Sequence, residues 1–378
     1  MQEIGNATTP RRRRYWLSPL VVLSACLVLL GAGSSLLIRV YFVHGGRRPW
    51  LSTMIQVSGW PLLLPPICAS LLLRHRRDGV SGGAVADHLL PPRLVGAVAV
   101  LGAFFAVACF AYSLGSQALP LSTSSLLQAT QLTFNAVSAF LFAGQRFTPF
   151  SVNAVVLLTV GPAVLGVGPS SDSERLPGEG GPAAYWTGFV DCMASAALLG
   201  LVLPLVEVAM SKYGHRSGRA TDAAVRAPPP SSYATVMQVQ AVMGAAGTAV
   251  CEVGMAVSKD FQAMPAEAAA FGLGEANYYL LLVLGAVSWQ LSNLGIMGLI
   301  VCSSSLLAGV MIALVLPLSE VLAVVFLHEK FDGAKGIALV LSLWGFVSYL
   351  YGESTQKKPE VAKGSEGLES ICCPLMAT

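Results

Sequence analysis

The chain has 378 residues, of which 54% are hydrophobic and 11% are charged, and its formal net charge at pH 7 is +3. A water-soluble chain of this length could not cover its surface with so few charges, so the composition indicates a polytopic membrane protein in a lipid bilayer. The net charge is too small and too dispersed to indicate a nucleic-acid partner. The basic run at residues 11–14 precedes an apolar segment instead of lining a helix with aromatic residues.

About ten apolar segments follow one another along the chain, each near the length of about 20 residues that a helix needs to cross a bilayer. The first five are expected at residues 17–43, 51–73, 94–112, 122–143 and 150–166. The second five are expected at residues 185–210, 233–257, 278–301, 304–327 and 333–352. The sequence therefore predicts an all-α polytopic membrane protein with about ten transmembrane helices.

The two groups of five segments are copies of each other. Residues 124–127, with the sequence SSLL, recur at 304–307, an offset of 180 residues. Phe147 and Gly161 recur as Phe331 and Gly345, an offset of 184 residues, and the difference of four is close to one helical turn. Two halves built from the same spans are a recurrent plan of transporters, and an odd number of spans per copy makes the two repeats inverted in the membrane.

Lysine and arginine set the expected orientation. Segments placed on the cytosolic side hold 16 of these residues and segments on the opposite side hold 6, which favours both termini in the cytosol. The expected organisation is a cytosolic N-terminal tail (1–16), a first five-helix repeat (17–166), a polar extracellular loop (167–184), a second five-helix repeat (185–352) with a cytosolic loop at 211–232, and a cytosolic C-terminal tail (353–378).

Five segments carry a resemblance to a known family. They are LLIRVYFVHGGRRPW (36–50), QVSGWPLLLPP (56–66), YSLGSQALPLSTSSLLQATQLTFNA (112–136), LPLVE (203–207) and FLHEKFDGAKGIALVLSLWGFVSYLYGE (326–353). In these segments the chain resembles the plant purine permeases of the drug/metabolite transporter superfamily. The resemblance implies about ten helices in two inverted repeats, a plasma-membrane location, and proton-coupled uptake of purine bases, cytokinins or related aromatic nitrogen heterocycles.

Three expected spans each carry two amide or indole side chains spaced four residues apart, so that each pair lies on one helix face. The pairs are Gln56 with Trp60, Gln131 with Asn135, and Trp289 with Asn293. Indole rings can stack on a purine, and amides can bond the donors and acceptors of its ring edge. The alternative is hydrogen bonding between helices, which polar residues in membrane helices commonly provide.

Two carboxylates follow prolines at the same spacing. Pro204 precedes Glu207 and Pro317 precedes Glu320, so each acid is expected about one turn beyond a helix break. Glu320 lies inside its span and is the first candidate for a proton carrier, since intramembrane acids commonly mark proton pathways. Glu207 lies nearer the cytosolic end of its span, where it could snorkel or pair with Lys212, and it is the second candidate for proton coupling.

Enzymatic chemistry, a metal site and a cofactor are not expected. All five histidines lie in loops or at the ends of spans, so no metal cluster or histidine base is available inside the membrane. Arg39 is the one cation expected within a span, which favours a neutral base over a phosphate-bearing substrate. The leading prediction is a proton-coupled transporter of purine-like bases. The alternative is an exporter or exchanger of other small aromatic metabolites on the same fold.

Overall fold

The computed structural model describes residues 19–78, 89–118, 127–128, 130–144, 149–167, 182–213, 233–327 and 333–356. All regular structure within these ranges is helical. The elements in chain order are α1 (Pro19–Leu30), α2 (Gly33–Val43), α3 (Pro49–Val57), η2 (Trp60–Leu63), α4 (Leu64–Asp78), α5 (Pro92–Ala118), α7 (Gln131–Ala143), α8 (Pro149–Val167), α9 (Pro182–Tyr213), α10 (Tyr233–Val257), α11 (Asp260–Ala270), α12 (Glu275–Cys302), α13 (Ser305–Leu327) and α14 (Gly333–Gln356).

Six helical stretches of the described chain are long and apolar enough to cross a membrane, and they coincide with the expected first, second, third, sixth, seventh and eighth spans. Shorter apolar helices coincide with the other four expected spans: Gln131–Ala143, Pro149–Val160, Ser305–Val315 and Leu339–Gly352. Large apolar side chains such as Val253 and Val283 are exposed along these helices, as a lipid-facing surface requires. The prediction of an all-helical polytopic membrane protein is confirmed.

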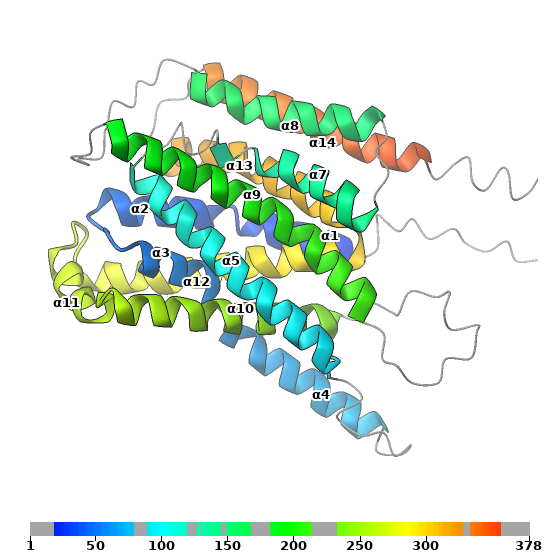
Figure 1. Ribbon diagram of the computed structural model, residues 1–378, viewed down its shortest axis with the longest axis horizontal. Coiled ribbons are helices and arrows are strands. Elements are labelled where there is room, and N and C mark those ends of the chain that lie inside the picture. Colours follow the sequence, from blue (N-terminus) through cyan, green and yellow to red (C-terminus); the bar gives the residue numbers. More distant parts are fainter. Residues whose placement is uncertain are drawn as a thin grey trace, which may run out of the picture.

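The helices pack in pairs that join distant parts of the chain (Figure 1). α5 lies along α9, α1 lies along α12, and α8 and α14 run side by side at one edge of the bundle. α10 packs on α5, and α7 packs on α9 and α13. In each of these pairs one helix comes from the first half of the chain and the other from the second half, so the core forms between the halves.

Small residues allow two of these pairs to approach closely. A Cβ added at Gly115 of α5 would meet the carbonyl oxygen of Gly188 and the backbone nitrogen of Cys192 on α9. A Cβ added at Gly295 of α12 would likewise meet the carbonyl oxygen of Ser24 and the backbone nitrogen of Val28 on α1. Glycine is the residue that lets two membrane helices bring their backbones into contact.

Two expected spans are interrupted. The first is divided into α1 and α2 by a turn at residues 31–32, and the second into α3, η2 and α4. Pro61 explains the second break, because proline lacks a backbone donor and disfavours the α conformation of the residue before it, Trp60. The prediction that Gln56 and Trp60 share the face of one helix was therefore wrong: Gln56 belongs to α3 and Trp60 begins η2.

Prolines inside the second half act differently. α9 continues through Pro204 and α13 continues through Pro317. The helix breaks expected before Glu207 and Glu320 are absent from these two described helices, because a proline inside a long membrane helix can be tolerated when neighbouring groups satisfy the freed carbonyl. A further difference is α11, a short helix in the segment that was expected to be a loop before the eighth span.

Candidate functional site

The end of α3 packs on the middle of α12, and we call this contact the α3–α12 junction; it comprises Gln56, Gly59, Trp60, Trp289, Gln290 and Asn293. α3 ends at Val57, so the Gln56 carbonyl lacks the helical partner that it would have in a continuous span. Asn293 fills this role, since its Nδ2 donates to that carbonyl oxygen at 2.9 Å. The eighth-span amide thus stabilises the break in the second span.

The side chain of Gln56 is also engaged. Its Nε2 donates to the carbonyl oxygen of Ser52 at 3.2 Å and, at the longer distance of 3.5 Å, to Ser113 Oγ of α5. Ser113 Oγ in turn accepts a hydrogen bond from Ser52 Oγ at 2.6 Å. The donors of Gln56 and Asn293 are therefore used in holding α3, α5 and α12 together, as the interhelical interpretation of these amides proposed.

Two other donors at the junction are not used in this way. Trp289 Nε1 and Gln290 Nε2 are both buried and have no hydrogen-bond partner among the residues that the structure describes. Helical geometry places Trp289, Gln290 and Asn293 within one face of α12 together with Ala286. Gly59 packs on that face, because an added Cβ would meet the Ala286 carbonyl and the Gln290 side chain.

Trp60 lies on the other side of the α3 break. A Cβ added at Gly244 of α10 would meet the Trp60 side chain, so the indole packs where α10 has no side chain of its own. Of the second-span pair, Gln56 thus meets the eighth-span pair through Asn293, whereas the contact shown for Trp60 is with α10. Gln290 was missed because the sequence was searched for pairs four residues apart. It could have been noticed as an amide inside the eighth expected span, directly after Trp289.

The fourth-span pair lies at another interface. Asn135 of α7 is fully buried, and its Nδ2 donates to the carbonyl oxygen of Ser305 at 3.1 Å. Gln131 Oε1 accepts from Gln128 Nε2 at 3.2 Å. Asn135 Oδ1 and Gln128 Oε1 are buried acceptors without a partner in the described part of the chain. α13 contacts both α7 and α12 and so lies next to both polar regions.

Glu207 stands at the start of α13. Its Oε2 accepts the backbone N–H of Ser305, the first residue of that helix, at 2.8 Å. A carboxylate is favoured there because the first N–H groups of a helix lack internal partners and carry partial positive charge. Glu207 thus caps α13, and the Lys212 ammonium lies 5.5 Å from the centre of the Tyr213 ring. The pairing of Glu207 with Lys212 stays a prediction. The side chain of Glu320 lies outside the described residues.

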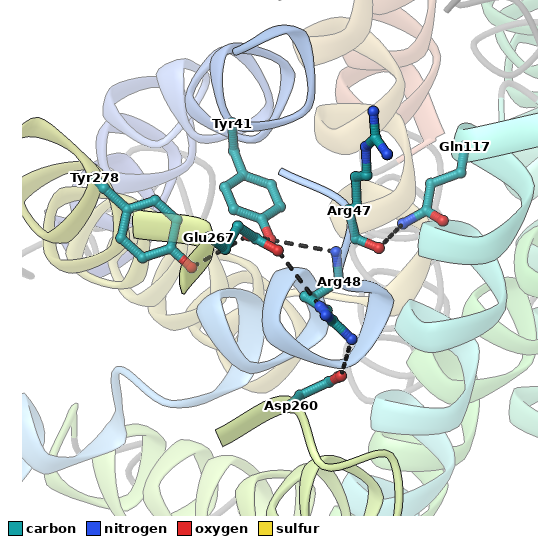
Figure 2. A network of polar contacts seen from close by, with 7 residues as sticks. All are labelled: Tyr41, Arg47, Arg48, Gln117, Asp260, Glu267 and Tyr278. Carbon is teal, nitrogen blue, oxygen red and sulfur yellow. Dashed lines mark hydrogen bonds and ion pairs between the residues drawn. The ribbon is translucent and has the colours of Figure 1, made fainter. Parts of the chain in front are cut away.

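A charged cluster, the Arg48 cluster, joins the turn between α2 and α3 to α11 and α12; it comprises Tyr41, Arg48, Asp260, Glu267 and Tyr278 (Figure 2). Arg48 Nη1 lies 3.1 Å from Asp260 Oδ1, and Arg48 Nε lies 3.5 Å from Glu267 Oε2. Glu267 Oε1 also accepts hydrogen bonds from the hydroxyls of Tyr41 at 2.6 Å and Tyr278 at 3.2 Å.

The Arg48 cluster holds two carboxylates against one guanidinium. The side chains of Asp260 and Glu267 are only 4% and 9% exposed, whereas Arg48 is 37% exposed. Two tyrosine donors compensate part of the excess negative charge at Glu267. Arg47 differs from its neighbour: its backbone carbonyl accepts from Gln117 at 3.5 Å, and Figure 2 shows its side chain directed away from the carboxylates.

A groove of about 530 Å³ lies at the end of α10 next to Trp50, and its lining includes no residue of the α3–α12 junction and none of α7. Its other lining residues are Ala249, Val250, Val253, Gly254, Val257 and Ser258. This lining is almost wholly apolar, and Val253 and Val257 are among the most exposed apolar residues of the described helices. The groove matches a lipid-facing surface better than a site for a polar heterocycle.

Comparison with known proteins decides the family. A family model described as purine nucleobase transmembrane transport matches residues 19–359. Purine permease 3 of Arabidopsis thaliana is 40% identical over 335 residues, which are 88% of this chain and 90% of that protein. The chain belongs to the purine permease family. Purine permease 2 of Arabidopsis thaliana is 37% identical over 359 residues, covering 92% and 95% of the two chains.

The purine permease resemblance seen in the sequence is therefore confirmed. A solved crystal structure aligns with this purine permease at a TM-score of 0.57 and 18% identity, covering 89% of this chain and 99% of the other, and it supports the fold alone. Membership in the family indicates an integral membrane transporter of purine nucleobases. The family is one of permeases rather than of enzymes.

Proposed function

We propose that the protein is a proton-coupled secondary transporter that carries purine bases, and related heterocycles such as cytokinins, across the plasma membrane. The observation that best supports a specific site is the set of buried polar atoms without partners in the described chain. Donors of this kind lie on α12 at Trp289 and Gln290, and acceptors lie beside α7 at Gln128 and Asn135. A purine presents both acceptor and donor atoms at its ring edge, so it could satisfy both sets.

The proposed substrate site comprises the α3–α12 junction and the polar face of α7. Trp60 and Trp289 supply ring surfaces for stacking, with Gln131 and Asn135 at the edge of the site. Gln56 and Asn293 position the break in the second span, because their donors bond other helices. Broken helices are where substrates bind in many transporters, since the backbone there is not fully used by helical hydrogen bonds.

The proposal includes two inverted five-helix repeats with both termini in the cytosol and the segment bounds expected above. Gly115 and Gly295 are separated by 180 residues, the same offset as the repeated SSLL motif. Each packs on a carbonyl oxygen and on the backbone nitrogen four residues later, in α9 and α1 respectively. The contact of the third span with the sixth thus has the same pattern as the contact of the eighth span with the first. This is the pattern expected if the first and second repeats are related by symmetry, because the third span then corresponds to the eighth and the sixth to the first.

Proton coupling is assigned first to Glu320 and second to Glu207. Glu207 already accepts a helix-terminal N–H at the start of α13, so it is the second candidate. We expect Glu320→Gln to abolish concentrative, pH-dependent uptake and to retain counterflow exchange, since glutamine keeps the shape but cannot release a proton. Glu207→Gln tests the second candidate in the same assay, and selective loss of concentrative uptake in that variant alone would move the role to Glu207. Full pH-dependent accumulation by well-expressed Glu320→Gln would remove Glu320 from this role.

The transport proposal is tested by uptake in cells that lack their own base uptake. Cells expressing the full chain should accumulate labelled adenine and a labelled cytokinin above the external concentration, and an uncoupler should abolish the accumulation. Accumulation that persists with the uncoupler would contradict proton coupling. Adenine efflux without uptake would favour the exporter alternative, and transport of neither compound would contradict the substrate class.

A further inference from the structure

We propose that Gln290 is a specificity-determining residue, whose side-chain amide donates a hydrogen bond to an acceptor ring nitrogen of the purine. The inference rests on the proposed function, because it needs a purine at the α3–α12 junction. Gln290 is 3% exposed, yet its Nε2 has no partner in the part of the chain that the structure describes. A buried amide donor without an acceptor is costly, so a ligand that supplies the acceptor gains from it.

The stem of this side chain is held by the backbone of the turn between α3 and η2. Gly59 lies so close that an added Cβ would meet both Cβ and Cγ of Gln290. The amide is therefore presented from a fixed position next to the break between α3 and η2, and little rotamer freedom is lost when a ligand binds. Preorganised donors of this kind discriminate well between ligands with and without the matching acceptor.

The remaining polar groups on this face of α12 define the type of ligand atom. Trp289 Nε1 is a second buried donor without a described partner, and an indole N–H cannot accept. Asn293 directs its donor to the Gln56 carbonyl. The two groups left without a described partner on this face are therefore donors, and a flat heterocycle with lone pairs on ring nitrogens matches them. Adenine has such nitrogens at positions 1, 3 and 7, and each can be replaced by carbon in a deaza analogue.

The experiment measures binding of labelled adenine to the purified full chain, with competition by 1-deaza-, 3-deaza- and 7-deazaadenine. In the unsubstituted protein we expect one analogue to bind about 5- to 20-fold more weakly than adenine. Gln290→Met keeps the length of the side chain and removes the amide. It should lower the affinity for adenine by the same factor, and it should change the affinity for the weakly binding analogue by less than about 2-fold. The discrimination against this one analogue disappears.

Thermal unfolding without ligand separates recognition from structure. Gln290→Met removes a donor that has no described partner, so its midpoint should stay equal or rise. Gln238→Met is the matched control on α10: Gln238 is also buried and takes part in an interaction within the protein, so this variant should lose stability and keep the deaza discrimination.

The outcomes distinguish the inference from the function on which it rests. Failure of the unsubstituted protein to bind adenine would overturn the proposed function and the inference together. Adenine binding with no discriminating analogue, or with discrimination retained in Gln290→Met, would overturn the inference and leave the function standing. A large loss of thermal stability in Gln290→Met with an equal loss of affinity for adenine and all three analogues would assign Gln290 a purely structural role.

Discussion

The Arg48 cluster and the α3–α12 junction are both buried polar regions, but they satisfy their polar groups in opposite ways. In the Arg48 cluster opposite charges and tyrosine hydroxyls meet directly, with contacts down to 2.6 Å between Tyr41 and Glu267. Asp260 pairs with Arg48 through Oδ1, while its Oδ2 has no described partner. The junction is built from neutral amides and indoles, and two of its donors have no described partner. Charged groups are too costly to leave unpaired in a low-dielectric interior, whereas a neutral donor can be left for a ligand.

This contrast suggests a division of roles. The Arg48 cluster links the α2–α3 turn of the first half to α11 and α12 of the second half, and its main contribution is to stability. The junction has less internal bonding and can exchange protein contacts for ligand contacts. Substitutions in the cluster should therefore lower the stability of the protein, and substitutions in the junction should lower its affinity for substrate.

The largest effect is expected from Arg48→Ala. It leaves two buried carboxylates without their cation, and because Arg48 is partly exposed we expect a loss of about 2–3 kcal/mol rather than the full cost of breaking a buried pair. Thermal unfolding of the purified protein measures this loss of stability. The affinity of the variant for adenine should stay unchanged. Arg47→Ala is the control, since Arg47 contributes its backbone carbonyl. Equal losses from both variants would contradict the role of the Arg48 cluster.

Trp60→Ala and Trp289→Ala test the other side of the comparison. Removing an aromatic surface that stacks on a base should weaken adenine binding by roughly 1–3 kcal/mol. Binding to purified protein measures the affinity, and the thermal midpoint should fall less than it does in Arg48→Ala. Unchanged affinity in both variants would remove the stacking role from the α3–α12 junction.

The tyrosines sharpen the comparison within the Arg48 cluster. Tyr41→Phe removes a 2.6 Å hydrogen bond to Glu267 and the 3.3 Å bond that the hydroxyl accepts from the Arg48 backbone N–H, and it should cost about 1.5–2 kcal/mol of stability. Tyr278→Phe removes a 3.2 Å bond to the same Glu267 oxygen and should cost about 1 kcal/mol. Chemical or thermal unfolding ranks the two variants. A larger loss of stability in Tyr278→Phe than in Tyr41→Phe would contradict the greater contribution expected from the Tyr41 hydroxyl.

The smallest effect is expected from Glu207→Gln. Glutamine can still accept the Ser305 N–H, so we expect the loss of the interaction between the negative charge and the start of α13, about 0.5–1 kcal/mol. Thermal unfolding detects this, and Lys212→Ala should lower the midpoint no more than Glu207→Gln does, since the exposed Lys212 ammonium contacts the Tyr213 ring. A larger loss of stability from Lys212→Ala than from Glu207→Gln would favour the pairing of Glu207 with Lys212 that the sequence predicts.

The sequence by itself determined the class of the protein and the course of its spans. Bilayer thickness sets the length of an apolar helix, so composition along the chain was enough to locate the apolar helices of the described chain, but not α11 or the breaks within the first two spans. It also indicated the family, and it picked out Trp60, Trp289 and Asn293 as residues of interest, because polar side chains are rare enough inside membranes to stand out.

Only the tertiary structure decided how these side chains are used. Asn293 bonds a carbonyl 237 positions away along the chain, and Tyr41 meets a carboxylate 226 positions away, and no local pattern predicts such partners. Gln290 became a candidate only when its burial and its unpaired donor could be seen. Hydrogen-bond satisfaction is a property of the packed core, where each donor or acceptor is either used by another helix or left for a ligand.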